Sequence, residues 1–266
     1  MSSVREDLLR LLGQVANAQS EIKLLNIYKG LPITYDTSIH FVSDTEVCVP
    51  ANRQHIACLY YQGETYLQGA RLPFLIRSQV MSLNLAKDDV ILADFEVAKH
   101  TIGNRSQIRV EPDETMFAYV QFIGSGFEIP APLADISTEG ASIHFDADLF
   151  PAKQAKPGNE LMISIPFPDA ISQRIIKPST KSLLESRGVK PALRTANWQD
   201  GKVTITARGK IVSVLQELHL NRYRVGMSLY FQDLARTVII QYISQRQTEI
   251  IRDLHLLSDE IYRAKK

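Results

Sequence analysis

Two short stretches of this sequence carry residue types suited to an anionic, nitrogen-rich ligand. The first places Arg105 and Arg109 four residues apart on an extended segment that leads into a new strand. A guanidinium is planar and always charged, so it can pair with a phosphate through two hydrogen bonds or stack on a purine. The second stretch holds Asp135, Ser137 and Gly140 at a predicted strand–turn–strand junction. A carboxylate accepts hydrogen bonds from amino donors, a hydroxyl donates or accepts them, and glycine allows close backbone approach or an unusual φ.

In this order the two stretches resemble the RxxxR and [D/N]xSxxG signatures of PilZ domains, the bacterial receptors for cyclic di-GMP. The segment 223–231 also looks like the last barrel strand before the helix in that family, so the resemblance covers 104 to about 252. It implies that cyclic di-GMP is contacted by Arg105, Arg109, Asp135, Ser137 and Gly140. Further candidates for ligand contact are Asn104, His144 and Gly226. Asn104 stands where many members carry another basic residue.

Composition limits the class of protein. Of the 266 residues, 45% are hydrophobic and 22% are charged, which is typical of a globular protein. A net charge of +1 argues against nucleic-acid binding through a broad positive field. We expect no membrane span, because eighteen apolar residues never run together, and no signal peptide. Cys48 and Cys58 do not make a disulfide framework, which predicts a reduced, cytoplasmic setting.

The first half of the chain is predicted to be a helix followed by short strands. Apolar residues at helical spacing predict an amphipathic helix over Ser3–Tyr28, which either packs on its own protein or serves as a partner helix. A tight turn is predicted at 43–44 and a hairpin turn at 62–64. The strand spacing indicates a small closed or half-closed barrel, similar in position to the amino-terminal barrel of flagellar-brake-type PilZ receptors. The predicted strands are 39–42, 46–49, 56–61, 65–67, 71–76, 80–85 and 90–98.

Two histidines and two cysteines of this half invite comparison with a metal site. On a strand, His55 and Cys58 would point to opposite faces, and with His40 and Cys48 they lack the paired spacing of a zinc site. We therefore expect ordinary strand packing and no metal.

The second half is predicted to form another barrel and to end in a long helix. A proline-containing insertion at 166–201 interrupts the predicted barrel, and the sequence does not indicate its function. After Phe231 no Gly or Pro occurs, and Asp233 is a suitable helix cap. A heptad pattern in this helix fits either a coiled-coil homo-oligomer or one amphipathic helix lying on the barrel. Its residues are Ile240, Ile243, Ile250, Leu254, Leu257 and Ile261. The barrel strands are predicted at 116–123, 133–135, 141–145, 161–165, 203–214 and 223–231.

These segments predict a mainly β protein with two small β-barrel domains and helices at both ends. The expected divisions are an N-terminal helix at 1–30, a split-barrel-like domain at 31–103, the RxxxR linker at 104–110, a six-stranded PilZ barrel at 111–235 and a C-terminal helix at 236–266.

The function predicted from these features is a non-catalytic cyclic di-GMP receptor. No histidine or carboxylate has the sequence context of a triad or an acid–base pair, so we expect neither an enzyme nor a cofactor. The resemblance implies that the ligand lies between the linker and the barrel face and changes the domain arrangement, which a protein partner in motility, secretion or exopolysaccharide synthesis reads. Two alternatives stay open: a ligand-independent, oligomeric PilZ-like interaction module, and a flavin-binding split-barrel enzyme. The sequence does not fix the output partner or the number of ligands.

Overall fold

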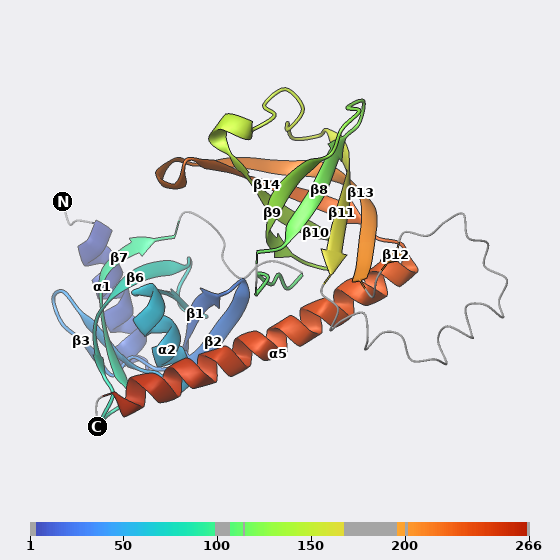
Figure 1. The fold of residues 1–266 in the computed structure, drawn as a ribbon. Helices are drawn as coiled ribbons and strands as arrows, with labels where there is room; N and C mark the ends of the chain where they lie inside the picture. The colour runs from blue at the N-terminus through green and yellow to red at the C-terminus, as the bar shows by residue number, and fades with distance from the viewer. Residues whose placement is uncertain (1–3, 99–106, 114, 168–195, 200–201, 265–266) are drawn as a thin grey trace. The chain divides into compact units, whose positions relative to one another are not determined.

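The computed structural model describes residues 4–98, 107–113, 115–167, 196–199 and 202–264 (Figure 1). The chain divides into two compact units, which we describe separately. The first unit comprises Met1–Ser106 and Thr248–Lys266, and the second comprises Gln107–Gln247. The fold is mainly β, as predicted: each unit contains a seven-stranded antiparallel sheet, and the helices are few.

The first unit combines helix α1 (Val4–Asn17), a curved open sheet and helix α2 (Arg53–Gln62). Leu8, Leu12 and Val15 of α1 are buried on one face of the helix, in the core that the sheet also lines. The strand order is β2-β1-β5-β6-β7-β4-β3, and the edge strands β2 and β3 do not pair with each other, so the barrel is half closed. The strands are β1 (Ile22–Tyr28), β2 (Leu31–Thr37), β3 (Phe41–Val42), β4 (Val47–Pro50), β5 (Glu64–Gln68), β6 (Ile76–Asn84) and β7 (Asp89–Val97).

The N-terminal helix is shorter than predicted. A helix over Ser3–Tyr28 is wrong, because α1 ends at Asn17 and Ile22–Tyr28 forms β1. Strands β1 and β2 pair along their whole length through the two-residue turn Lys29-Gly30, whose φ angles are 48° and 82°. Two consecutive positive φ angles match the right-handed twist of a hairpin, so this turn fixes 22–37 as paired strands.

The predicted strand 56–61 is also wrong, because these residues lie in α2. The Asn52 side chain accepts a hydrogen bond from the His55 backbone N–H at 2.8 Å and caps the helix. At the other end Gly63 has a φ of 69° and its N–H bonds to the Leu59 carbonyl. The predicted hairpin turn at 62–64 is therefore a helix terminus with a left-handed glycine. Of the predicted strand 71–76, only Ile76 belongs to a strand.

His55 and Cys58, assigned by sequence to a strand, are both buried on α2. Burial lowers the pKa of His55 to about 4 and raises the pKa of the Cys58 thiol to about 12. In the part of the chain that the structure describes, no group of three or more His, Cys, Asp or Glu side chains is arranged to hold a metal ion.

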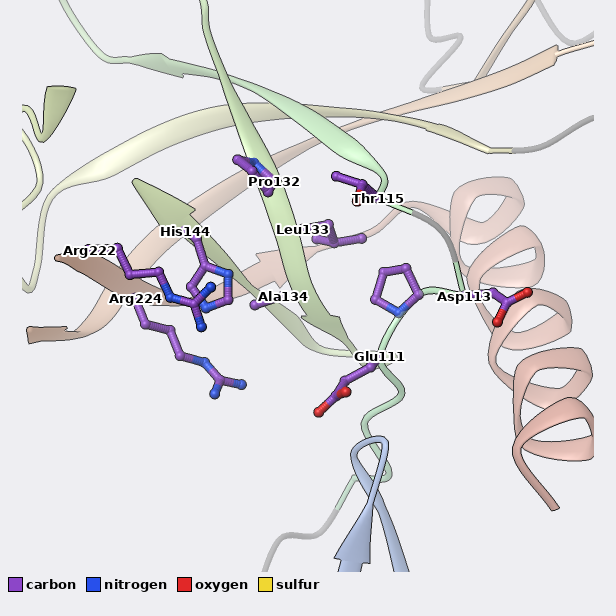
Figure 2. A pocket seen from close by; sticks show the side chains of 10 residues that line it. Glu111, Asp113, Thr115, Pro132, Leu133, Ala134, His144, Arg222 and Arg224 are labelled. Atoms are coloured by element: carbon purple, nitrogen blue, oxygen red, sulfur yellow. The ribbon is translucent and has the colours of Figure 1, made fainter. Parts of the chain in front are cut away.

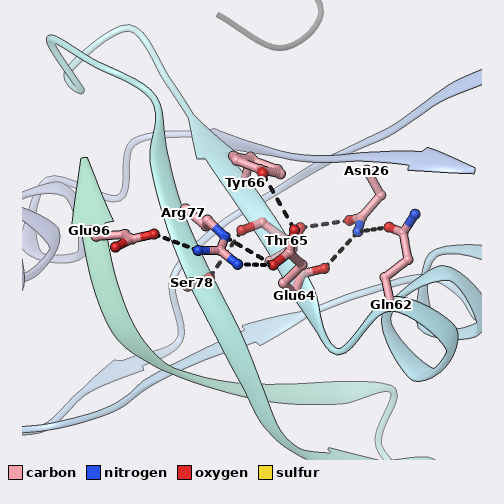
Figure 3. Close-up of polar contacts among 8 residues, drawn as sticks. All are labelled: Asn26, Gln62, Glu64, Thr65, Tyr66, Arg77, Ser78 and Glu96. Carbon is pink, nitrogen blue, oxygen red and sulfur yellow. Dashed lines mark hydrogen bonds and ion pairs between the residues drawn. The ribbon is translucent and has the colours of Figure 1, made fainter. Parts of the chain in front are cut away.

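A buried polar network joins the end of α2 to the sheet (Figure 3). Asn26 donates to the Gln62 side chain and to the Glu64 carbonyl, and it accepts from Thr65 at 2.7 Å. Arg77 pairs with Glu64 and Glu96 on neighbouring strands. Because Asn26 and Thr65 are almost fully buried, each depends on this network for its hydrogen bonds.

The second unit is a closed six-stranded barrel, as predicted for the PilZ segment. The order is β11-β8-β9-β10-β14-β13, and pairing of β11 with β13 closes the ring. A seventh strand, β12, pairs with the first part of β13. Alternate residues of each barrel strand fill the interior, among them Ala141, Ile143 and Phe145 of β10. The strands are β8 (Phe117–Phe122), β9 (Ile129–Ile136), β10 (Gly140–Asp146), β11 (Glu160–Phe167), β12 (Ala196–Gln199), β13 (Lys202–Glu217) and β14 (Arg222–Tyr230).

The insertion predicted at 166–201 begins later than expected, because β11 continues to Phe167. Residues 196–199 form β12, and 168–195 lie outside the described residues.

The C-terminal helix is present as α5 (Asp233–Arg263), beginning at the predicted cap residue. Three residues of the predicted heptad seam, Ile243, Ile250 and Leu254, are buried within their own chain, whereas Ile240 is 47% exposed. In this conformation the buried three are not available to a second copy, which favours the amphipathic-helix alternative. No helix in the described ranges has the length and apolar character needed to cross a membrane.

Candidate binding site on the barrel face

The turn between β9 and β10 carries the second sequence motif. The Ser137 backbone N–H and hydroxyl both donate to the Gly140 carbonyl, at 2.8 and 3.1 Å. The same hydroxyl accepts from the Glu139 N–H at 3.4 Å. Ser137 is only 2% exposed, so its hydroxyl serves the turn itself in this structure.

Gly140 is required by the neighbouring strand. A Cβ at this position would lie well under 3.0 Å from the Met227 carbonyl oxygen of β14, a separation that real Cβ atoms essentially never show. The φ angle of Gly140 is not positive, so the unusual φ that the sequence analysis considered is not observed. Close approach of two backbones is therefore what selects glycine here.

A bulge in β9 places Asp135 on the outside of the barrel. Ser142 of β10 pairs with Asp135, but the next residue, Ile143, pairs with Leu133, so Ala134 is left over. Two residues apart on a regular strand, Leu133 and Asp135 would share a face. The extra residue lets Leu133 enter the core while Asp135 turns outward beside Ser142.

The same outer face continues across β10 and β14. Ser142 pairs with Gly226, and His144 pairs with Arg224. Because cross-strand partners lie on one face, these four residues and Asp135 form a continuous polar surface. At Gly226 the Ser213 hydroxyl of β13 occupies the space where a Cβ would lie.

Asp135 binds two arginines that come from distant parts of the sequence. Arg109 Nη1 donates to Asp135 Oδ1 at 3.2 Å and to Ser142 Oγ at 3.3 Å. Arg224 Nη2 donates to the other oxygen, Oδ2. The Asp135 side chain is 3% exposed, whereas the side chains of Arg109 and Arg224 are 25% and 35% exposed. The carboxylate is thus covered by guanidinium groups that themselves still reach solvent.

Arg109 is held in place by the segment on either side of it. Val110 and Ile136 exchange two backbone hydrogen bonds of 3.0 Å, which attach the segment to the end of β9. Gln107 accepts from Thr138 at 2.6 Å and donates to Glu139 at 3.2 Å. The second half of the RxxxR stretch therefore lies directly against the second motif.

A pocket of about 400 Å³ opens beside this cluster (Figure 2). Arg222, Arg224 and His144 form one side of it, and Glu111 and Asp113 lie on the other. Its remaining lining residues are Pro112, Thr115, Pro132, Leu133 and Ala134. The volume falls in the range of small-ligand sites, about 300–1,000 Å³.

Arg222 shifts the pKa values of two groups near it, His144 and Glu217. Burial, and next the charge of Arg222, lower the pKa of His144, which favours a neutral imidazole near pH 7. Burial acts to raise the pKa of Glu217, but the hydrogen bond and charge of Arg222 outweigh it, and the pKa is lowered. His144 Nε2 is buried and has no hydrogen-bond partner in the described part of the chain, with Glu217 Oε2 3.8 Å away.

The far wall of the pocket is fixed by helix α5. Arg246, almost fully buried, donates to the Glu111 carbonyl at 2.8 Å and pairs with Asp113 at 3.1 Å. The segment that carries Arg109 is therefore attached to the barrel at one end and to α5 at the other.

Most of the predicted site residues come together in the second unit. Arg109, Asp135, Ser137, Gly140, His144 and Gly226 lie on or beside this face. Asn104 and Arg105 lie outside the described residues.

Sequence reasoning missed Arg224, Arg222 and Ser142. The signal was available in part: within 222–226, two arginines and a glycine alternate with Tyr223 and Val225, and period-two alternation places the three on one strand face.

Comparisons with known proteins return similar structures only. No family model matches the sequence, and neither does any curated protein. The K. pneumonia MrkH–c-di-GMP complex is 10% identical, with 95% of this chain and 98% of that chain aligned and a TM-score of 0.40. The Bacillus subtilis inhibitor of motility MotI/DgrA is 10% identical, with 87% and 97% aligned and a TM-score of 0.38. The PilZ domain of Escherichia coli YcgR with c-di-GMP is 9% identical, with 56% and 96% aligned and a TM-score of 0.34. PilZ is the family that the two sequence motifs resemble.

Proposed function

We propose that this chain is a receptor that binds cyclic di-GMP, without catalysis, on the outer face of its second-unit barrel. The supporting observation is the meeting of Arg109 with Asp135, at 3.2 Å, in a place that also contains the Ser137–Gly140 turn. These residues are the second half of one motif and the whole of the other, separated by up to 31 positions along the chain.

The chemistry of the ligand suits this surface. Cyclic di-GMP carries two phosphodiesters, each with one negative charge, and two guanines. Guanidinium forks can pair with a phosphate or with guanine N7 and O6, and their flat faces stack on purines. Arg105 supplies a further guanidinium from the same linker.

Ligand binding is proposed to change the arrangement of the two units. The 104–109 segment joins them covalently, so a ligand that contacts this segment shifts the equilibrium between arrangements of the units by as much as its affinity differs between those arrangements. A protein partner in motility, secretion or exopolysaccharide synthesis would read this change. Small-angle scattering with and without ligand tests this step: an unchanged radius of gyration and profile at saturation would argue against it.

Calorimetric titration with cyclic di-GMP tests the receptor itself. Arg105→Ala should weaken binding by about ten- to a hundredfold, because a charge-assisted hydrogen bond contributes on the order of 1.5–3 kcal/mol. Asp135→Ala should weaken binding to a similar extent, because Arg109 loses the carboxylate that orients it. Arg208→Ala is the control: Arg208 also lies on this barrel and pairs with a carboxylate, Glu160, but outside the proposed site. The proposal fails if the unmutated protein shows no measurable binding at high micromolar ligand, or if Arg208→Ala weakens binding as much as the site variants.

A further inference from the structure

Arg224 belongs to neither sequence motif, yet it lies at the centre of the barrel-face cluster. It extends from β14, pairs with His144 of β10 across the strands, and binds Asp135. It also lines the pocket, on the same side as Arg222 (Figure 2). Its side chain is 35% exposed, so part of the guanidinium faces solvent.

The two arginines on Asp135 divide its oxygens between them. Arg109 uses Oδ1 and Arg224 uses Oδ2, so one carboxylate orients two forks toward the same surface. A guanidinium has five N–H donors, so each arginine keeps donors that do not bind Asp135. With a side chain only 3% exposed, Asp135 is better placed to orient these donors than to meet a ligand directly.

The net charge of the cluster favours a ligand group with one negative charge. Two guanidinium cations and one carboxylate sum to one positive charge, which matches a single phosphodiester. The neighbouring charges add little: Arg222 is paired with Glu217, and Asp113 is paired with Arg246.

We propose that Arg224 is an anion-binding residue of this site, which holds a phosphodiester of the ligand together with Arg109 while Asp135 orients both. The inference rests on the proposed function, because the phosphodiester is that of cyclic di-GMP. It extends the site from the two motifs onto β14.

The test is titration of Arg224→Met and Arg224→Lys with cyclic di-GMP at low and high salt. Arg224→Met should bind about ten- to a hundredfold more weakly, and its affinity should fall less with added salt because one cationic contact is gone. Arg224→Lys should recover part of the loss, because lysine supplies the charge without the fork. Arg208→Met is the matched control and should bind as the unmutated protein does. Circular dichroism establishes that each variant is folded, and Arg224→Lys serves alone if the methionine variant is not.

The outcomes separate the two proposals. If the unmutated protein binds and Arg224→Met binds equally well or more tightly, Arg224 is only a counter-ion for Asp135, and this inference is overturned while the receptor stands. Equal loss in Arg224→Lys and Arg224→Met, with unchanged salt dependence, also overturns it, since phosphate pairing would then not be the role. Absence of binding by the unmutated protein overturns the receptor and this inference with it.

Discussion

Replacing Gly140 by alanine should destabilise the second-unit barrel without touching any ionisable group. The new Cβ would meet the Met227 carbonyl oxygen, and the Met227 carbonyl carbon and the Ser228 Cα lie at 3.5 and 3.6 Å behind it. All three are backbone atoms of β14, so no side-chain rotation relieves the clash. Pushing β14 away would also strain the hydrogen bond from the Leu229 N–H to the Glu139 carbonyl, now 2.9 Å.

The magnitude follows from overpacking a strand interface, which costs about 1–3 kcal/mol. A second effect opposes it, since alanine lowers the entropy of the unfolded chain and stabilises by about 0.4–1 kcal/mol wherever the native backbone tolerates it. Gly126→Ala measures that second effect alone. Gly126 lies in the β8–β9 turn of the same barrel and has no positive φ, and a Cβ added there would have no heavy atom within 4 Å.

Urea unfolding of both variants, followed by circular dichroism, gives the comparison. Gly126→Ala should be unchanged or slightly more stable, and Gly140→Ala should lie about 1–3 kcal/mol below it at an unchanged denaturant slope. If the two variants agree within about 0.5 kcal/mol, the close approach of β10 and β14 is not what selects glycine at 140. The glycine of this motif would then have to be explained by the ligand.

Two further predictions concern the first unit. His55 has a folded pKa of about 4 against an ordinary 6.5, so the unfolded chain binds more protons below pH 6.5, and about 3 kcal/mol of stability should be lost between pH 6.5 and 4. Urea unfolding at several pH values measures this loss. His55→Leu should reduce the dependence of the unfolding free energy on pH, and the control His40→Gln, at an exposed site, should not; the same pH dependence in His55→Leu and the unmutated protein would contradict the prediction. Asn26→Leu should cost about 1–3 kcal/mol in the same assay, because the partly buried Gln62 and the buried Thr65 lose hydrogen bonds; an unchanged midpoint would show that the network is dispensable.

The sequence predicted the second unit better than the first. Strands such as β11, with strict alternation of buried and partly exposed residues, carry a period of two that identifies them directly. The residues of α2 carry no such signal, since His55 through Leu59 are all buried and a short apolar run fits a strand or a helix. The deciding features are local: Asn52 as a cap and Gly63 as a terminator. Likewise the apolar run 22–28 continues the helical pattern, and only the Lys29-Gly30 turn marks it as a strand of a hairpin.

The site shows a different limit. The resemblance to the two PilZ motifs predicted a shared location for Arg109, Asp135 and Gly140, but not that Asp135 would be covered by a second arginine. That contact depends on the β9 bulge and on the register of β10 against β14, and neither follows from the residue types of the two motifs. Period-two alternation could place Arg224 on the outer face, whereas only the register could place it opposite His144.

Under the proposed function, the connections between the two units offer a route by which binding at this face affects the first unit. The chain passes from one unit to the other after Ser106 and again after Gln247. Within the second unit, both passages start at the cluster: Gln107 bonds to the Asp135–Gly140 turn, and Arg246 bonds to the segment that carries Arg109. Under the proposed function, a ligand that moves Arg109 would displace residues beside both connections at once. The ligand would not need to contact the first unit. It would be enough for the ligand to bind more tightly to one arrangement of 107–113 and α5 than to another.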